Sequence, residues 1–265
     1  MYTVTNGKPT NDQPPTTTTV SGCRPGSDIN VTGYEITSLG TSHLLTFNKF
    51  PAARPHMLLL TQDGFRRQHE RLDRDDLAAM WATINTLNNS KKRYLAFYNC
   101  GFESGCSRLH KHMQVFPAPD AGTFTLWPDH EENKFRRKMI PFKYSMFRYE
   151  KDWSATPGGL LEIYQELLRQ AEEDLVSYTT NSISPTENGK KAERMEGAAI
   201  PHNVIMNRDW MVVIPRRAGG WDGATGNAPA MLGMVWLPSV EKMNRWIELG
   251  PCEVLGRMGV PAPKE

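Results

Sequence analysis

The chain has 265 residues, of which 39% are hydrophobic and 23% are charged, and its formal net charge is +2 at pH 7. This balance is typical of a globular protein and excludes a chain that is disordered throughout. The small net charge gives no electrostatic reason to expect a nucleic-acid polymer as partner, although a small basic pocket for a phosphorylated ligand is compatible with it. The length fits one large domain or two small ones.

The cysteines and the hydropathy pattern indicate the cellular compartment of the protein. The four cysteines, at positions 23, 100, 106 and 252, form no C-x-x-C pair, which argues against a structural zinc site. They are too few for a disulfide scaffold, so a reducing compartment is predicted. Residues 1–20 lack the apolar segment of a signal peptide, and no stretch approaches the roughly 18 apolar residues of a membrane helix. We expect no membrane partner and a cytoplasmic or nuclear location.

The elements, taken in chain order, predict an α+β fold. Residues 1–27 are rich in Thr, Pro, Gly and Asn and predict a mobile arm without a core of its own. Expected strands then cover residues 31–36, 43–48, 56–61, 94–99, 110–116, 203–206 and 211–215. Expected helices cover residues 73–87, with Asp73 as the cap, and 158–177, both with apolar residues at helical spacing. A last helix is expected over residues 239–249, because it begins with a serine cap and ends at Gly250-Pro251.

The remaining segments complete one domain over residues 28–265. Residues 118–156 have an irregular pattern, and the polar segment 178–199 predicts a disordered surface loop. Residues 200–260 are expected to complete the domain. The whole pattern predicts a mainly antiparallel sheet with the helices packed on one face.

Segment 110–114, HKHMQ, carries most of the functional information. It follows a loop that contains glycine and serine, GFESGCS. Alternate side chains of a strand point to the same face, so His110, His112 and Gln114 are expected on one surface. The same pairing of strands would bring Asn99 close to His112. Two imidazoles and an amide beside a Gly/Ser loop suit nucleophilic attack on a phosphate.

The three side chains have different expected roles. His112 is the expected nucleophile, because neutral imidazole is available near pH 7, and a main-chain carbonyl on its other ring nitrogen would fix the tautomer. His110 would orient and pack. Gln114 would donate a hydrogen bond to a phosphate oxygen, and since an amide cannot protonate a leaving group, it favours leaving groups that are already good, such as polyphosphates. The backbone amides of residues 105–108 and the Ser107 hydroxyl would hold phosphate oxygens.

Simpler interpretations compete with this one. Two histidines on a strand are more often packed or metal-binding than nucleophilic, but a zinc site would need a third ligand, and an amide stands at the third position. We therefore expect no metal site. Small size explains Cys106 better than thiol chemistry. A structural hydrogen bond is favoured over catalysis for His56, and the tryptophans are expected mostly in the core, although one could stack on a base.

The motif H-x-H-x-Q, preceded by N-x-G…S-G-x-S, resembles the transferase branch of the histidine-triad (HIT-like) superfamily. The strongest resemblance is to the fungal-type diadenosine tetraphosphate phosphorylases, also called ATP adenylyltransferases. Galactose-1-phosphate uridylyltransferases share the reduced pattern but usually have proline at the position of Lys111. Three further segments carry the resemblance in the same order: NKFP…PHMLLL at 48–60, PHNVIMNRDWMVVIPR at 201–216 and GPCEVLGRMG at 250–259.

The resemblance implies a HIT-like fold and an adenylyl-enzyme intermediate. Diadenosine tetraphosphate would react at His112 and release ATP, and phosphate would then take the adenylyl group to give ADP. The substrate-binding residues that the resemblance implies are Asn48 and Lys49, the phosphate loop of Asn99, Gly105, Cys106, Ser107 and Arg108, and the carboxy-terminal Asn203, Arg208 and Arg216. No cofactor is implied, although a divalent cation could act as counter-ion of the nucleotide, and a monomer or a homodimer is expected.

Some positions depart from the family pattern. Arg108 and Leu109 stand where the family often has Gln and a small or acidic residue, and His202 replaces a Tyr. Two alternatives therefore stay open. One is a diverged member that acts on another substrate in a fungal secondary-metabolite pathway, and the other is an adenine-nucleotide sensor without catalysis.

Overall fold

The computed structural model of the chain describes residues 1–4, 23–88, 92–130, 140–150, 153–182 and 198–263. Within these residues the strands are β1 (Tyr2–Val4), β2 (Glu35–Leu39), β3 (His43–Phe47), β4 (Met57–Thr61), β5 (Tyr94–Cys100), β6 (His112–Pro117), β7 (Ser145–Arg148), β8 (His202–Met206), β9 (Trp210–Pro215), β10 (Gly220–Trp221), β11 (Ala224–Thr225) and β12 (Val235–Leu237). The α-helices are α1 (Arg74–Leu87), α2 (Pro157–Ser182), α3 (Ala228–Met231), α4 (Val240–Leu249) and α5 (Pro251–Met258), and short 3₁₀ helices cover Phe102–Ser104 and Trp127–Asp129.

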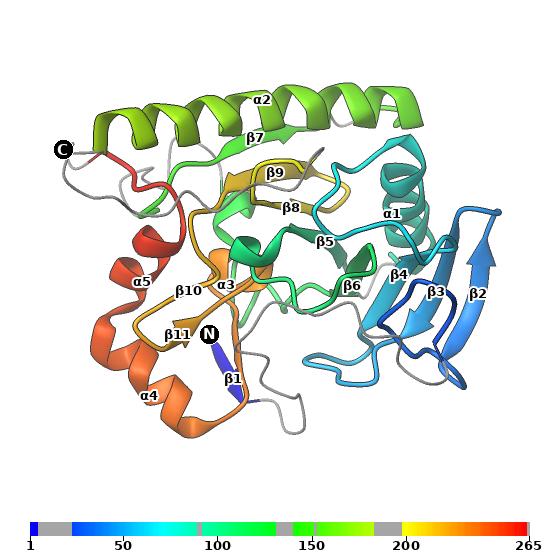
Figure 1. Cartoon of the computed structure of the whole chain (residues 1–265), viewed down its shortest axis with the longest axis horizontal. Coiled ribbons are helices and arrows are strands. Elements are labelled where there is room, and N and C mark those ends of the chain that lie inside the picture. The colour runs from blue at the N-terminus through cyan, green and yellow to red at the C-terminus, as the bar shows by residue number, and fades with distance from the viewer. Residues whose placement is uncertain (5–22, 89–91, 131–139, 151–152, 183–197, 264–265) are drawn as a thin grey trace.

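One eight-stranded sheet organises the molecule, with the strand order β2-β3-β4-β6-β5-β8-β9-β7. All its neighbouring strands are antiparallel. Figure 1 shows α2 lying along one side of this sheet, with α4 and α5 on the opposite side. The predicted α+β class with a mainly antiparallel sheet is confirmed.

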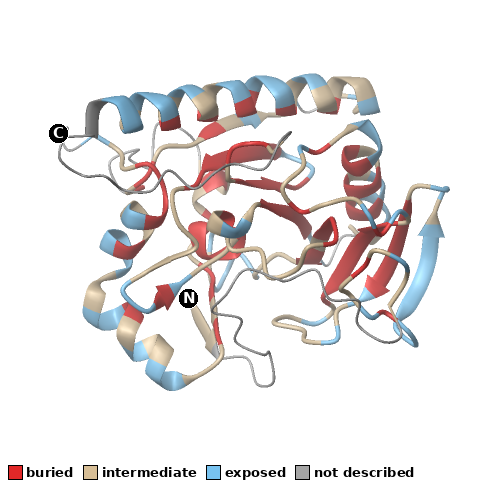
Figure 2. Ribbon diagram, viewed as in Figure 1, coloured by how far each residue is buried: buried red, intermediate tan, exposed pale blue. Residues whose placement is uncertain are grey.

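The sheet is covered on both faces, so the expectation of helices on one face is wrong. Every residue of β5, β8 and β9 is buried, and these strands are coloured mainly red in Figure 2. Along β5, Ala96 and Tyr98 join the core under α1 and α2, whereas Leu95 and Phe97 join the core with α3, α4 and α5. Strands that are apolar at every position need apolar cover on each side, and the carboxy-terminal segment supplies the second layer.

Helix α1 begins where its sequence predicts. The Asp73 side chain accepts hydrogen bonds from the backbone amides of Asp75 and Asp76, and the Asp76 side chain accepts one from the backbone amide of Asp73, which completes a capping box. Such a cap is worth about 1 kcal/mol. Helix α4 has the predicted serine cap, because the Ser239 hydroxyl accepts from the amide of Lys242.

Residues 1–27, predicted as a mobile arm without a core of its own, pack on the rest of the domain at both of their described ends. Tyr2–Val4 forms β1 and pairs in parallel with β12. At the other end, Ser27 is buried and its hydroxyl lies 2.7 Å from Nδ1 of His110. Residues 5–22 are outside the described part of the chain. A polar composition cannot reveal these contacts, because the partners lie more than 80 positions away in the sequence.

Other boundaries differ in detail. The first long strand is Glu35–Leu39 rather than 31–36, because residues 32–34 turn, with Gly33 at φ +81°. Helix α2 continues to Ser182, so residues 178–182 of the predicted loop are helical, while residues 183–197 lie outside the described residues. Residues 118–156, expected to be irregular, contain β7, and a separate helix, α5, follows the predicted stop at Gly250.

Candidate active site

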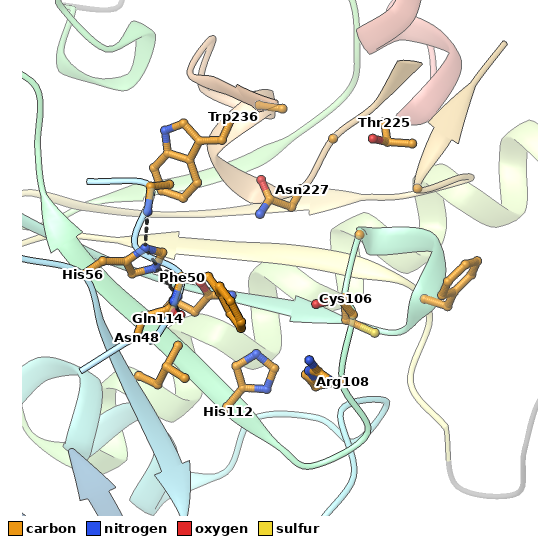
Figure 3. Close-up of a pocket in the computed structure, with 18 of the residues that line it drawn as sticks. Asn48, Phe50, His56, Cys106, Arg108, His112, Gln114, Thr225, Asn227 and Trp236 are labelled. Atoms are coloured by element: carbon orange, nitrogen blue, oxygen red, sulfur yellow. Dashed lines mark hydrogen bonds between the residues drawn. The ribbon is translucent and has the colours of Figure 1, made fainter. Parts of the chain in front are cut away.

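His112 and Gln114 of strand β6 face a cavity of about 770 Å³ between the sheet and the carboxy-terminal layer. Its lining includes the predicted residues Asn48, Lys49, Gly105, Cys106, Ser107 and Arg108. In Figure 3, His112 lies near Arg108 and Cys106 from the loop before β6, and Gln114 lies beside Asn48 and His56. Residues from the connection between β3 and β4 and from the loop before β6 thus lie around His112 and Gln114.

The orientation of the His112 ring is fixed by its own strand. Nδ1 of His112 lies 2.8 Å from the main-chain oxygen of His110. A carbonyl oxygen only accepts hydrogen bonds, so Nδ1 carries the hydrogen, and in the neutral ring Nε2 has the lone pair. The sequence-based expectation of a carbonyl on this nitrogen agrees with the geometry. His112 as a whole residue is only 5% exposed.

Gln68, a residue that no sequence pattern singled out, holds the backbone of His112. The ladder between β5 and β6 runs from Tyr94 to Phe97 and ends two residues before the position where Asn99 would meet His112. There the amide of Gln68 fills the gap. Its Oε1 accepts from the His112 amide at 2.8 Å, and its Nε2 donates to the carbonyls of Asn99 and His112 at 3.0 Å each.

The loop before β6 turns sharply at Gly105. Gly105 has φ +86°, and a Cβ there would lie 2.7 Å from the main-chain oxygen of Gly226, so only glycine fits this close approach. Within the same loop, burial raises the pKa of the Cys106 thiol to about 12. Cys106 is therefore a neutral, space-filling group at neutral pH and not a reactive thiolate.

The cavity has a positive balance of charge. Among the described residues, four cationic ones line it, namely Lys49, Arg108, Arg217 and Lys242, against two acidic ones, Asp28 and Glu103. The carboxylate of Asp28 already accepts hydrogen bonds from the amides of Leu109 and His110, both at 2.9 Å. Arg217, Lys242, Asn227, Trp236 and His56 were not selected as binding residues from the sequence. For Arg217 the Arg-Arg pair at the end of a strand was an available signal, whereas nothing local marks Asn227.

Five residues predicted for the site do not line the cavity: His110, Asn99, Asn203, Arg208 and Arg216. Their positions explain why. The His110 ring is fully buried, with Nε2 3.0 Å from the hydroxyl of Thr61, and burial lowers its pKa. It reaches His112 only through its main-chain oxygen. Arg208 lies in the turn beyond Met206, the end of β8 away from Asn203.

Asn99, Asn203 and Arg216 form a buried hydrogen-bonded chain behind the loop. Arg216 Nη1 donates to Oδ1 of Asn203 at 2.6 Å, and Nδ2 of Asn203 donates to Oδ1 of Asn99 at 2.9 Å. Arg216 also donates to the carbonyl of Gly226, and Asn203 to that of Ser104, both at 2.9 Å. These residues therefore shape the two loops that line the cavity. Burial lowers the pKa of Arg216 to about 9, so its guanidinium is still charged at neutral pH.

On the other face of β6, Lys111 anchors the strand to helix α1. Its fully buried ammonium lies 2.6 Å from Oδ2 of Asp76, and Nε2 of His43 lies 3.0 Å from Oδ1 of the same carboxylate. Burial acts to raise the pKa of Asp76, but the hydrogen bond from His43 and the charge of Lys111 outweigh it and hold the pKa at about 2. This cluster fixes the strand from behind while His112 faces the cavity.

Two family models match the chain in order. The Ap4A phosphorylase N-terminal domain matches residues 32–128, and the ATP adenylyltransferase C-terminal domain matches residues 138–261. The chain belongs to the Ap4A phosphorylase family, whose two domain models match it one after the other. The two domains meet in one continuous sheet, since β5 of the first pairs with β8 of the second.

Relatives and solved structures agree with this assignment. Diadenosine 5',5'''-P1,P4-tetraphosphate phosphorylase 2 of Saccharomyces cerevisiae is 26% identical over 224 residues, 77% of this chain and 65% of the relative. Protein APA1 of the same yeast is 24% identical over 66% of this chain and 54% of its own length. The chain thus spans less than two thirds of either relative. The crystal structure of yeast Ap4A phosphorylase Apa2 has a TM-score of 0.69 at 22% identity, covering 91% of this chain and 82% of that one.

The same yeast protein has also been solved with Ap4A, and that structure has a TM-score of 0.65 at 23% identity, covering 84% of this chain and 75% of that one. These likenesses establish the HIT-like fold of the chain.

Two structural facts concern other kinds of site. No helix in the described part of the chain has both the length and the apolar character needed to cross a bilayer. The described residues contain no group of three or more His, Cys, Asp or Glu side chains placed to hold a metal ion.

Proposed function

We propose that the chain is a nucleotidyltransferase of dinucleoside polyphosphates, which converts diadenosine tetraphosphate and phosphate to ATP and ADP through a nucleotidyl-His112 intermediate. The observation that carries the proposal is the hydrogen bond from Nδ1 of His112 to the carbonyl of His110, which leaves the lone pair on Nε2 in a ring that lines the cavity. The family and the Ap4A-bound relative support the choice of substrate.

The reaction has two displacements at one phosphorus. In the first, Nε2 of His112 attacks the α-phosphorus of the substrate, a P–N bond forms, and the P–O bond to the β-phosphate breaks, so ATP leaves with the electron pair. The ring is then cationic, and the carbonyl of His110 stabilises it through the Nδ1 hydrogen. In the second, an oxygen of inorganic phosphate attacks the same phosphorus, the P–N bond breaks, and ADP leaves a neutral His112.

The side chains around His112 suit these two steps. ATP is an anionic leaving group that needs no proton, which agrees with an amide at position 114 rather than a third imidazole. Lys49 and Arg108 supply positive charge for the phosphates, and the turn at Gly105 brings the loop backbone close to them. Trp236 and Phe50 offer aromatic faces for a base. A divalent cation would act as counter-ion of the polyphosphate.

Intact-mass spectrometry tests the proposal. After incubation with diadenosine tetraphosphate and without phosphate, the protein should gain the mass of one AMP, and addition of phosphate should remove that mass and yield ADP. His112→Ala should form no adduct. His69→Ala, a change at a half-buried histidine outside the cavity, is the matched control and should form it. An adduct in His112→Ala would overturn the role of His112.

The sensor alternative gives a different result in the same assay. A protein that only senses adenine nucleotides would bind diadenosine tetraphosphate in calorimetry but form neither adduct nor product. That outcome would overturn the proposed function.

A further inference from the structure

His56 lies in the wall of the cavity next to Gln114, at the start of strand β4. Its side chain is almost fully buried, with the whole residue 4% exposed, between the rings of Trp236 and Phe116 at centroid distances of 5.5 and 6.2 Å. The main-chain oxygen of His56 accepts from the amide of Asn48 at 2.8 Å. The loop after β3 therefore holds this residue in place from both its backbone and its ring.

The hydrogen bonds of the His56 ring determine its tautomer. The backbone amide of Ala52 donates to Nδ1 at 3.2 Å, and since a backbone N–H only donates, Nδ1 must carry the lone pair. The hydrogen of the neutral ring is then on Nε2. That atom lies 2.9 Å from Oε1 of Gln114, an oxygen that only accepts. The contacts of the Asn48 amide with the two ring nitrogens are longer, at 3.4 and 3.5 Å.

The chain of hydrogen bonds therefore runs in one direction, from Ala52 through His56 to Gln114. Figure 3 shows the His56 ring beside Gln114. A side-chain amide has two ends of different character, and a flip of 180° exchanges its oxygen for its NH₂ group. With the oxygen held by His56, the NH₂ group of Gln114 is the end left to act as a donor toward the cavity. An amide turned the other way would point an oxygen at the phosphate and repel it.

We propose that His56 is a positioning residue, which locks the Gln114 amide so that its NH₂ group donates to a non-bridging oxygen of the phosphorus attacked by His112. The inference rests on the proposed function. His56 acts through Gln114 and does not itself protonate the leaving group, because its Nε2 hydrogen is already donated to Gln114. The two residues would therefore contribute as one unit in the transition state.

A double-mutant cycle on the rate of adduct formation tests this coupling. The variants are His56→Phe, which keeps an aromatic ring against Trp236, Gln114→Ala, and the two together. We expect each single change to lower the single-turnover rate by up to roughly 100-fold, the scale for losing one donor to a developing anion. The double variant should be no more than about twofold slower than Gln114→Ala alone. If His56→Phe lowered the rate by the same factor in wild type and in Gln114→Ala, His56 would have a merely structural role and the inference would be overturned.

A conservative replacement and a measurement without turnover complete the test. The amide of His56→Gln can donate from the position of Nε2, so this variant should recover most of the rate that His56→Phe loses. Nitrogen-15 spectra of the full-length protein with labelled histidine should show the His56 ring with its hydrogen on Nε2, identified by the signal lost in His56→Phe. A hydrogen on Nδ1 would overturn the inference even if wild type formed no adduct, and failure of the adduct alone would overturn the proposed function.

Discussion

Replacement of Gln68 by leucine tests how the fold holds His112, the proposed nucleophile. The Gln68 amide makes three hydrogen bonds to the backbone at the point where strands β5 and β6 separate, two of them to His112. Leucine has a similar size but no polar atoms, and the three backbone groups would stay buried without this partner. At about 1 kcal/mol for each bond, the loss in the free energy of unfolding is about 3 kcal/mol.

The same change should reduce the rate of adduct formation at His112. Without Gln68 the end of β6 is free to shift relative to Asn99, and a displacement of about 1 Å at a reacting group can cost about 100-fold in rate. Urea unfolding gives the stability, and single-turnover mass spectrometry gives the rate. Gln170→Leu, on the outer helix α2, is the matched control and should leave both values near those of wild type.

A Gln68→Leu variant whose free energy of unfolding lies within about 1 kcal/mol of wild type, and which forms the adduct at the wild-type rate, would contradict this role of Gln68. A stability loss with an unchanged rate would show that other contacts, such as that of His112 with its own strand, are enough to place the ring.

Three further predictions concern residues that support the site. Burial lowers the pKa of His202 to about 4, below its unfolded value of about 6.5, so the folded state binds fewer protons and the free energy of unfolding falls by up to about 3 kcal/mol as the pH falls from 6.5 to 4. In urea titrations, His202→Asn should lose less free energy of unfolding between pH 7 and pH 5 than wild type does, and an equal loss would contradict the role of His202. Gly105→Ala should cost about 1–3 kcal/mol and abolish adduct formation, because of the positive φ and the contact with Gly226, as thermal melts and mass spectrometry would measure. Lys111→Met should lower the free energy of unfolding by about 3–5 kcal/mol by stranding the Asp76 carboxylate; a second change, Asp76→Asn, should recover part of it, and no recovery would mean that the ion pair is not the cause.

Several features of the site could be predicted from local sequence. The alternation in HKHMQ places His112 and Gln114 on one face, because side chains of a strand alternate, and both do line the cavity. The helix at residues 74–87 follows from its Asp73 cap and apolar spacing. The neighbouring loop residues 105–108 reach the same cavity, since they directly precede the strand.

Other residues could be named from the sequence but not placed. Asn99, Asn203 and Arg216 belong to matched segments, yet they form a buried layer behind the loops, because Asn99 and Asn203 lie opposite each other in the pairing of β5 with β8. His110 shares the alternation of the motif, but the ladder of β6 begins only at His112, and Thr61 and Ser27 take up its ring.

The sequence by itself determined the class of fold, the strand that carries His112 and Gln114, and the family, because these depend on periodicity and on motifs within short windows. Only the tertiary structure decided which polar groups face the cavity and which support them. Gln68 meets His112 across 44 positions, and His56 meets Gln114 across 58. No local pattern encodes such partners, since a buried amide or imidazole in a loop has no periodicity and takes its role from whatever the packed chain brings within 3 Å of it.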